Sequence, residues 1–232
     1  MNNAAGTISG NGGLDLRAGT LYNSKGRIEV SGDAGTNVDV SAVVDNSEGK
    51  LLSAGDIVLK AGELKNIAGV LRATDRSALE AKVAGLLDNS SGGEISGCGD
   101  MVLGAATLNN QSGVIQHAGK GELRLNVETL QGVSGTIASN GLLALTGVVL
   151  DLTGAATQAD AINIDGRALT HVGGRLAVLG TDAAVITVQE QMNNAGGDIA
   201  TNGALDLNAG SLSNRGGEIR VAGTEATRVT VA

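Results

Sequence analysis

Apolar residues recur along the chain in a unit of about 21 residues. Each unit begins with an apolar residue, usually has Asn two positions later and Gly three positions after that, and continues with an aliphatic residue. The eleven units begin at Met1, Leu21, Val44, Leu64, Leu87, Leu108, Leu130, Leu150, Leu169, Met192 and Leu212. Self-similarity at a fixed short period indicates a solenoid, in which each repeat packs only on its neighbours.

Each unit closes with two apolar residues separated by one residue, as in Leu14 and Leu16 or Leu123 and Leu125. Alternation with a period of two is typical of a strand with one buried face. No window shows the apolar stripe of an amphipathic helix. The pattern predicts an all-β parallel β-helix of about eleven coils with three short strands per coil. One strand lies around the first residue of the unit, one around the eighth, and one over the closing segment.

Two columns of turn residues run through the units. The third position is Asn in eight units, at Asn3, Asn23, Asn46, Asn66, Asn89, Asn110, Asn194 and Asn214. The sixth position is Gly in ten units, at Gly6, Gly26, Gly49, Gly69, Gly92, Gly113, Gly135, Gly174, Gly197 and Gly217. Asn tolerates the left-handed region, Gly supplies positive φ, and stacked Asn side chains can form hydrogen-bonded ladders. A ligand site is local, so columns of this length favour a structural interpretation.

The composition fits a narrow, periodic interior. The chain has no Phe, Trp or Pro, and Tyr22 is its one aromatic residue. Stacked aliphatic side chains fill a small coil better than rings do, and internal strands exclude Pro because they donate hydrogen bonds to neighbouring strands. A net charge of −8 argues against nucleic-acid binding. No apolar run approaches the length of a membrane helix, so no membrane insertion is expected.

No motif predicts a catalytic, cofactor or metal site. Cys98 has no partner for an internal disulfide, and His117 and His171 stand alone in the sequence. Some parallel β-helices degrade polysaccharides with clustered carboxylates, but the outward acids Asp15, Asp39 and Asp206 are expected on distant coils. We therefore expect no enzyme activity.

A loose basic group is the remaining candidate for recognition. Its members are Lys60, Lys65, Arg72, Arg76 and Lys82. It could contact sulfated glycans, but interspersed acidic residues favour a solvated face. Insertions at 32–37, 75–78 and 180–184 are expected to form surface loops.

A longer repeat relates the two ends of the chain. Residues 1–40 and 192–231 agree without gaps at 22 positions, and both ends are in register with the coils. Because open solenoid ends expose unpaired sheet edges, we expect residues 1–232 to form a single β-helical segment of a longer fibre.

The repeated segments resemble the haemagglutinin repeats of the filamentous haemagglutinin family. The resemblance lies in Met1 to Ile8, Leu21 to Ile28 and Leu212 to Ile219, and in the Leu-Asp-Leu segments at 14–16 and 205–207. It covers essentially the whole chain and is weakest over 130–191. It implies a large bacterial exoprotein that forms a right-handed β-helical fibre and leaves the cell through an outer-membrane transporter of a two-partner secretion system.

The same resemblance implies a location at the bacterial surface or outside the cell. Members of the family serve as adhesins that attach to a glycan or protein receptor on host cells, or as stalks of contact-dependent inhibition systems that carry a toxin. We expect a shaft segment of an adhesin first, a toxin-delivery stalk second, and a polysaccharide-degrading enzyme third.

Overall fold

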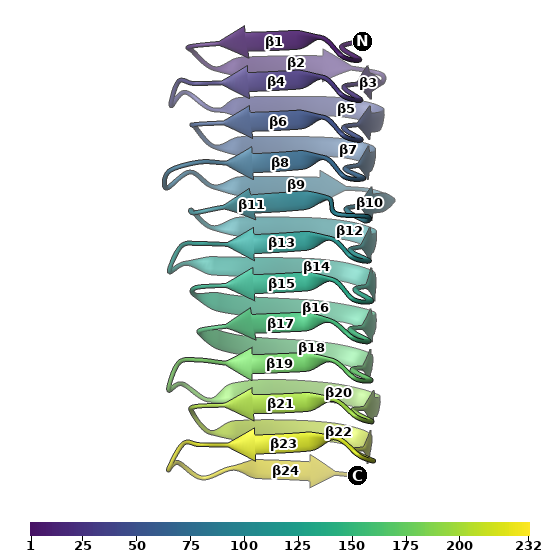
Figure 1. The fold of residues 1–232 in the computed structure, drawn as a ribbon, viewed down its shortest axis with the longest axis vertical. Coiled ribbons are helices and arrows are strands. Elements are labelled where there is room, and N and C mark those ends of the chain that lie inside the picture. Colours follow the sequence, from purple (N-terminus) through teal and green to yellow (C-terminus); the bar gives the residue numbers. More distant parts are fainter.

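The structure, a computed structural model, describes residues 1–232 and consists of strands and turns only. Parallel strands stack along one axis, with the two termini at opposite ends (Figure 1). The nearer strands run from right to left and the more distant ones from left to right as the chain descends, so the coil is right-handed. No helix of the kind that crosses a membrane occurs. The prediction of an all-β, right-handed parallel β-helix of about eleven coils is confirmed.

The first sheet has eleven strands, all formed around the eighth position of a unit. They are β1 (Thr7–Gly10), β4 (Arg27–Val30), β6 (Lys50–Ser53), β8 (Val70–Ala73), β11 (Glu94–Gly97), β13 (Val114–His117), β15 (Thr136–Ser139), β17 (Ala156–Ala159), β19 (Arg175–Val178), β21 (Asp198–Thr201) and β23 (Glu218–Val221).

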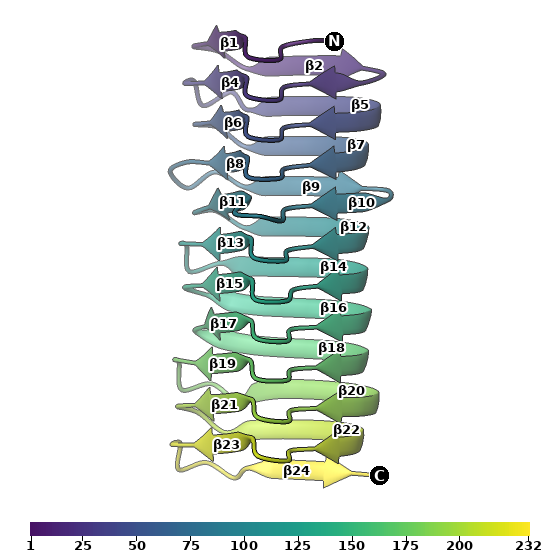
Figure 2. The ribbon, with the colours of Figure 1, turned by 45° about the vertical axis from the view of Figure 1, so that its right-hand side comes forward.

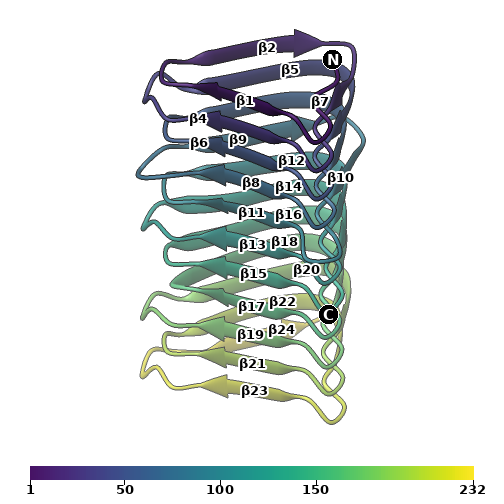
Figure 3. The same ribbon diagram turned by 45° about the horizontal axis from the view of Figure 1, so that its top comes forward.

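The second sheet has thirteen strands, formed by the closing segments and the unit starts. They are β2 (Leu14–Ala18), β3 (Leu21–Tyr22), β5 (Thr36–Asp45), β7 (Ile57–Lys65), β9 (Leu79–Val83), β10 (Leu86–Asp88), β12 (Met101–Asn109), β14 (Glu122–Gln131), β16 (Leu142–Asp151), β18 (Ala161–Thr170), β20 (Ala184–Asn193), β22 (Leu205–Ser213) and β24 (Arg228–Val231). Viewed obliquely from the N-terminal end, the two sheets face each other across the interior (Figure 3).

The expectation of three separate strands per coil is too fine for most of the molecule. In eight coils the closing segment and the next unit start form one strand of nine or ten residues. These strands bend around one edge of the rod (Figure 2). Irregular register at the bend, as between Val40 and Val43, lets the strand turn the corner without ending.

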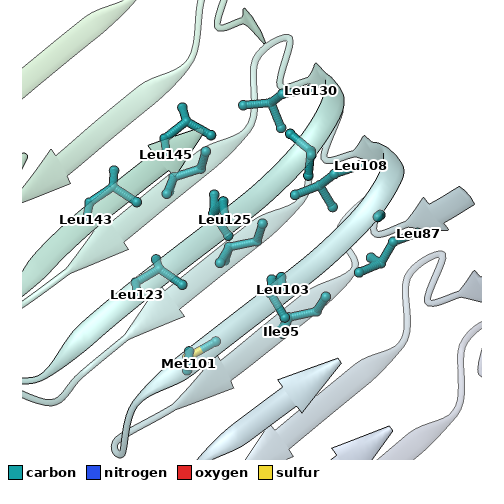
Figure 4. Close-up of a cluster of buried hydrophobic side chains, with 14 of the residues drawn as sticks. Leu87, Ile95, Met101, Leu103, Leu108, Leu123, Leu125, Leu130, Leu143 and Leu145 are labelled. Atoms are coloured by element: carbon teal, nitrogen blue, oxygen red, sulfur yellow. The ribbon is translucent and has the colours of Figure 1, made fainter. Parts of the chain in front are cut away.

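The register follows the repeat. Unit starts pair with unit starts, as Leu87 does with Leu108 and Leu108 with Leu130. Inward side chains therefore stack in columns, such as Leu103, Leu125 and Leu145 (Figure 4). The resulting core is one cluster of 47 buried residues without an aromatic ring.

The segments with insertions lie mostly between strands. Residues 31–35 separate β4 from β5, residues 74–78 separate β8 from β9, and residues 179–183 separate β19 from β20. The expected loops extend too far at residues 36, 37 and 184, which belong to β5 and β20. All three connections lie at the same edge, on the left in Figure 1, opposite the bend of the long strands.

Candidate functional site

The Asn column forms a ladder of side-chain hydrogen bonds inside the rod. Asn3 Nδ2 donates to Asn23 Oδ1 at 2.7 Å, and the same contact continues to Asn46, Asn66, Asn89 and Asn110 at 2.7–2.8 Å. The second amide hydrogen reaches a backbone carbonyl of the next coil, as from Asn66 to Glu94 at 3.0 Å. These side chains are buried. Their polar atoms are therefore occupied by one another and by the backbone.

The Gly column lies where successive coils approach most closely. A Cβ at Gly69 would overlap the carbonyl oxygen of Asn46 in the preceding coil, and a Cβ at Gly26 would overlap that of Asn3. Neither glycine has positive φ. Of the ten glycines in the predicted column, Gly92 alone has positive φ. The sequence interpretation of this column as a source of positive φ is therefore wrong for the other nine, and at Gly26 and Gly69 steric contact between coils is what requires Gly.

The left-handed residue of each turn is the one before this glycine. All eleven turns have positive φ at this fifth position, at Ala5, Lys25, Glu48, Ala68, Ser91, Ser112, Ser134, Gly154, Gly173, Gly196 and Gly216. In ten of these turns the amide of the following residue donates to the carbonyl of the third position, as from Gly69 to Asn66 at 3.1 Å. This arrangement is a type II turn, which requires positive φ at its third residue. Variable residue types hid this position in the sequence.

One member of the predicted Gly column is displaced. The turn after Asn89 has an additional residue, so that Gly92 has a φ of 83° and open space around it. Gly93 instead lies against the Asn66 carbonyl and donates to Ser90 at 3.0 Å. The prediction of Gly92 as the member of the column in this unit is therefore wrong, and Gly93 takes that place.

The ladder is interrupted in three coils. Gly132 and Leu152 occupy the Asn position in two of them, and His171 occupies it in the third. His171 Nδ1 lies 2.6 Å from Asn194 Oδ1, and Asn194 Nδ2 donates to Asn214 at 2.6 Å. The rod thus contains two ladders, one from Asn3 to Asn110 and one from His171 to Asn214.

The other isolated residues do not come together. Cys98 is exposed in the turn after β11. His117 is buried on β13, where Nδ1 lies 2.9 Å from Ser139 Oγ. Burial lowers the pKa of His117, against the opposing effects of the Asp100 charge and the Gly99 backbone.

The structure divides the basic group between two sheets. Lys60, Lys65 and Lys82 belong to β7 and β9, Arg72 lies on β8 of the other sheet, and Arg76 lies in a turn. Arg72 pairs with Glu94 and Lys82 with Glu80. Lys60 and Lys82 border a shallow depression of about 480 Å³.

Carboxylates also fail to form a cluster. No three His, Cys, Asp or Glu side chains converge as a metal site would require. Asp15 pairs with Arg17 at 3.0 Å. The expectation that the outward acids lie on distant coils is wrong for two of them, because Asp15 and Asp39 belong to the adjacent strands β2 and β5. Asp206 is far away on β22.

The fold and these contacts define a structural solenoid protein, in which the turns of successive coils are linked by hydrogen-bonded Asn side chains. The sequence model of the haemagglutinin repeat matches residues 1–42, 30–96, 73–147 and 189–227. The chain belongs to the haemagglutinin repeat family, and its suspected kinship with filamentous haemagglutinins is confirmed. No curated protein and no solved structure matches the chain.

The family is a structural adhesin type, and it is associated with two-partner secretion and with secreted or cell-surface proteins. The three units without Asn at the third position begin at Leu130, Leu150 and Leu169. The second and most of the third lie within residues 148–188, which separate the matched segments, and the first directly precedes them. This part of the rod therefore departs most from the repeat.

Proposed function

We propose that the chain is a shaft segment of a secreted bacterial adhesin, which holds receptor-binding regions away from the cell for attachment to host cells. The observation that carries the proposal is the uninterrupted stacking of coils over residues 1–232, in which the strands of both sheets pair with those of the next coil. A rod of about eleven coils at about 4.8 Å each extends about 50 Å. Stiffness and length are what such a segment contributes.

The Asn and Gly columns serve this shaft as structural elements. The Asn amides hydrogen-bond to one another and to backbone carbonyls. The glycines let the turns of adjacent coils approach. Neither column presents a free functional group to a ligand, which supports a structural role and no enzymatic one.

The parent protein is proposed to leave the cell through an outer-membrane transporter of the two-partner type and to remain at the bacterial surface or be released. Membership in the haemagglutinin repeat family supports this route. Folding of each coil onto the previous one would bury an open sheet edge as the chain emerges, and this favours outward movement.

A register-preserving deletion in the parent protein tests the shaft proposal. Removing residues 44–129 deletes four complete units and joins two equivalent positions, because Val44 and Leu130 are both unit starts. We expect surface display and attachment to host cells to persist on a fibre shortened by about 19 Å. Loss of attachment with normal display would overturn the proposal.

A matched deletion of residues 44–119 ends within a unit and should prevent display, because it joins positions that face different sides of the coil. The isolated chain provides a second measurement. Beads coated with residues 1–232 should show no saturable binding to host cells, and saturable binding would assign receptor recognition to this segment itself.

A further inference from the structure

His171 occupies an unusual position within the interrupted part of the rod. It replaces Asn in the column, it is 1% exposed, and it begins the second ladder. Its Nε2 is buried without a hydrogen-bond partner. A buried polar atom without a partner is uncommon and requires a physical explanation.

The contacts of Asn194 fix the tautomer of His171. Asn194 Nδ2 donates to Gly197 O at 3.3 Å and to Asn214 Oδ1 at 2.6 Å, so its Oδ1 is the atom that faces His171. An amide oxygen only accepts, and therefore His171 Nδ1 carries the proton. The neutral ring then has its lone pair on Nε2, with no donor beside it.

The missing donor belongs to the preceding coil. Elsewhere the Asn side chain donates to the carbonyl of the residue that follows the next turn, as Asn46 does to Val70 and Asn110 to Thr136. Arg175 is the equivalent residue after Leu152, and Leu152 has no hydrogen to donate. The Arg175 carbonyl lies beside the His171 ring. Two acceptors, Nε2 and this carbonyl, thus meet where the ladder is broken.

The charges around His171 are balanced against one another. Asp198 on β21 is paired with Arg220 on β23, and Arg167 on β18 is paired with Glu190 on β20. Arg175 on β19 lies in register with Asp198, and Asp151 at the end of β16 accepts from Thr153 N at 2.9 Å. No carboxylate forms an ion pair with the ring. A proton on Nε2 would gain the Arg175 carbonyl as acceptor but would place an unpaired cation in the interior.

We propose that His171 is an acid-sensitive joint of the solenoid, at which proton uptake loosens the coils from Leu150 to the C-terminal ladder while the coils of the first ladder stay closed. The neighbouring departures from the repeat, Gly132 and Leu152, leave this stretch without the side-chain bonds that hold coils 1–6 together. Opening therefore begins where the links between coils are fewest.

The direction of the pH effect follows from burial. Burial lowers the pKa of His171 below its ordinary value, and the hydrogen bond to Asn194, the nearby Arg175 carbonyl and the Asp198 charge oppose it only in part. The folded state thus binds fewer protons than the unfolded one. The stability that neutral His171 contributes is fully present above the unfolded pKa of about 6.5. It decreases as the pH falls from that value to the folded pKa.

Hydrogen exchange of the full 232-residue chain between pH 7.5 and 5 tests the joint. After correction for intrinsic exchange rates, protection of amides in β16 to β19 should fall by up to about tenfold per pH unit below 6.5. Protection in β4 to β8 should stay constant. In His171→Asn, which places the ladder residue at this position, the pH dependence of β16 to β19 should disappear.

His117→Ser is the matched control, because it removes the other buried histidine and installs the residue type found at Ser53 and Ser139 in the same column. It should retain the pH dependence. The joint is refuted if wild type and His171→Asn lose protection alike, or if His117→Ser abolishes the effect.

Should His171→Asn fail to fold, the imidazole resonances of the wild type decide, with His117 assigned from the His117→Ser spectrum. Titration of His171 below pH 6.5 in step with the loss of protection supports the proposal. A His171 that stays neutral while β16 to β19 lose protection overturns it.

Discussion

At the scale of single residues, each turn holds one strained backbone position and one sterically restricted one. The fifth position of the unit is left-handed in all eleven turns, and seven of those residues are not Gly. A left-handed conformation costs a residue with a Cβ about 1–2 kcal/mol. In most units the sixth position is restricted for another reason, since the preceding coil occupies the space of its Cβ, as at Gly26 and Gly69.

Ala68→Gly should stabilise the protein by up to about 1 kcal/mol, because Ala68 is exposed with a φ of 51°. Urea unfolding followed by circular dichroism measures the change. Ala138→Gly, in strand β15, is the control and should destabilise by about 0.5–1 kcal/mol, because its conformation does not need Gly. Equal effects at both sites would contradict the assignment of strain.

Asn66→Leu should destabilise the protein by about 3 kcal/mol. Leu is accommodated at this position in the coil of Leu152, so the cost arises from the lost partners of Asn46, Asn89 and the Glu94 carbonyl. The exposed Asn208 has no side-chain hydrogen bond, and Asn208→Leu should stay within about 0.5 kcal/mol of wild type. A small effect at Asn66 would mean that the ladder contributes little.

At the scale of elements, the strands carry a largely aliphatic interior, and a polar residue interrupts the central column of the first sheet. The central column of the first sheet includes Ile115, Ile137 and Leu176, but Thr157 on β17 takes the position between Ile137 and Leu176. Thr157 is 1% exposed, and its hydroxyl has no hydrogen-bond partner. The outward faces are instead polar, with ion pairs two residues apart on one strand, as between Arg124 and Glu122.

Thr157→Val should stabilise the protein by about 1–2 kcal/mol, because it replaces an unsatisfied buried hydroxyl with a methyl group of similar size. Thermal unfolding measures the shift. Thr146→Val, at an exposed position of β16, should leave stability within about 0.5 kcal/mol. A destabilised Thr157→Val protein would indicate that the hydroxyl has a partner after all.

At the scale of the whole molecule, each coil contacts only its neighbours, so stability is a sum of coil terms and interface terms. Strand pairing follows this scheme throughout, because every strand pairs only with strands of the adjacent coils. Effects at distant coils should therefore be independent, and effects at adjacent coils should not.

A double-mutant cycle tests this scheme. Asn66→Leu with Asn89→Leu should cost about 1 kcal/mol less than the sum of the single changes, because the two residues share one hydrogen bond. Asn66→Leu with Asn194→Leu should be additive within about 0.5 kcal/mol. Strong coupling between Asn66 and Asn194 would require a cooperative unit that spans the rod.

Much of this architecture could be predicted from the sequence, because equivalent positions of successive units pair with one another and the repeat therefore gives the register. The unit starts Leu64, Leu87 and Leu108 are equivalent in the repeat, and Leu87 pairs with both of the others in the structure. The continuous strands around the bend could not be predicted, because a bent strand and two short strands have the same apolar alternation. The prediction of Gly92 is wrong because the turn after Asn89 has one additional residue. Since Gly92 and Gly93 are adjacent glycines, the residue types alone do not reveal that insertion.

The chemistry of the turns was predictable only in part. The Asn ladder follows from residue type, but the left-handed fifth position does not, since Ala68 and Lys25 carry no signal of positive φ. The protonated nitrogen of His171 depends on Asn194 and Asn214, which lie in two successive coils. Such properties arise from packing between coils.

The Asn ladder also has a direction. Every side-chain amide from Asn3 to Asn89 donates toward the C-terminal end, so the amide dipoles point the same way along the axis. In a buried row each bond polarises the next, and the bonds strengthen one another. Reversing one amide would set oxygen against oxygen on one side and hydrogen against hydrogen on the other. The amides of the row are therefore expected to keep one common orientation. The row ends at Asn110, because Gly132 and Leu152 have no side-chain amide to continue it.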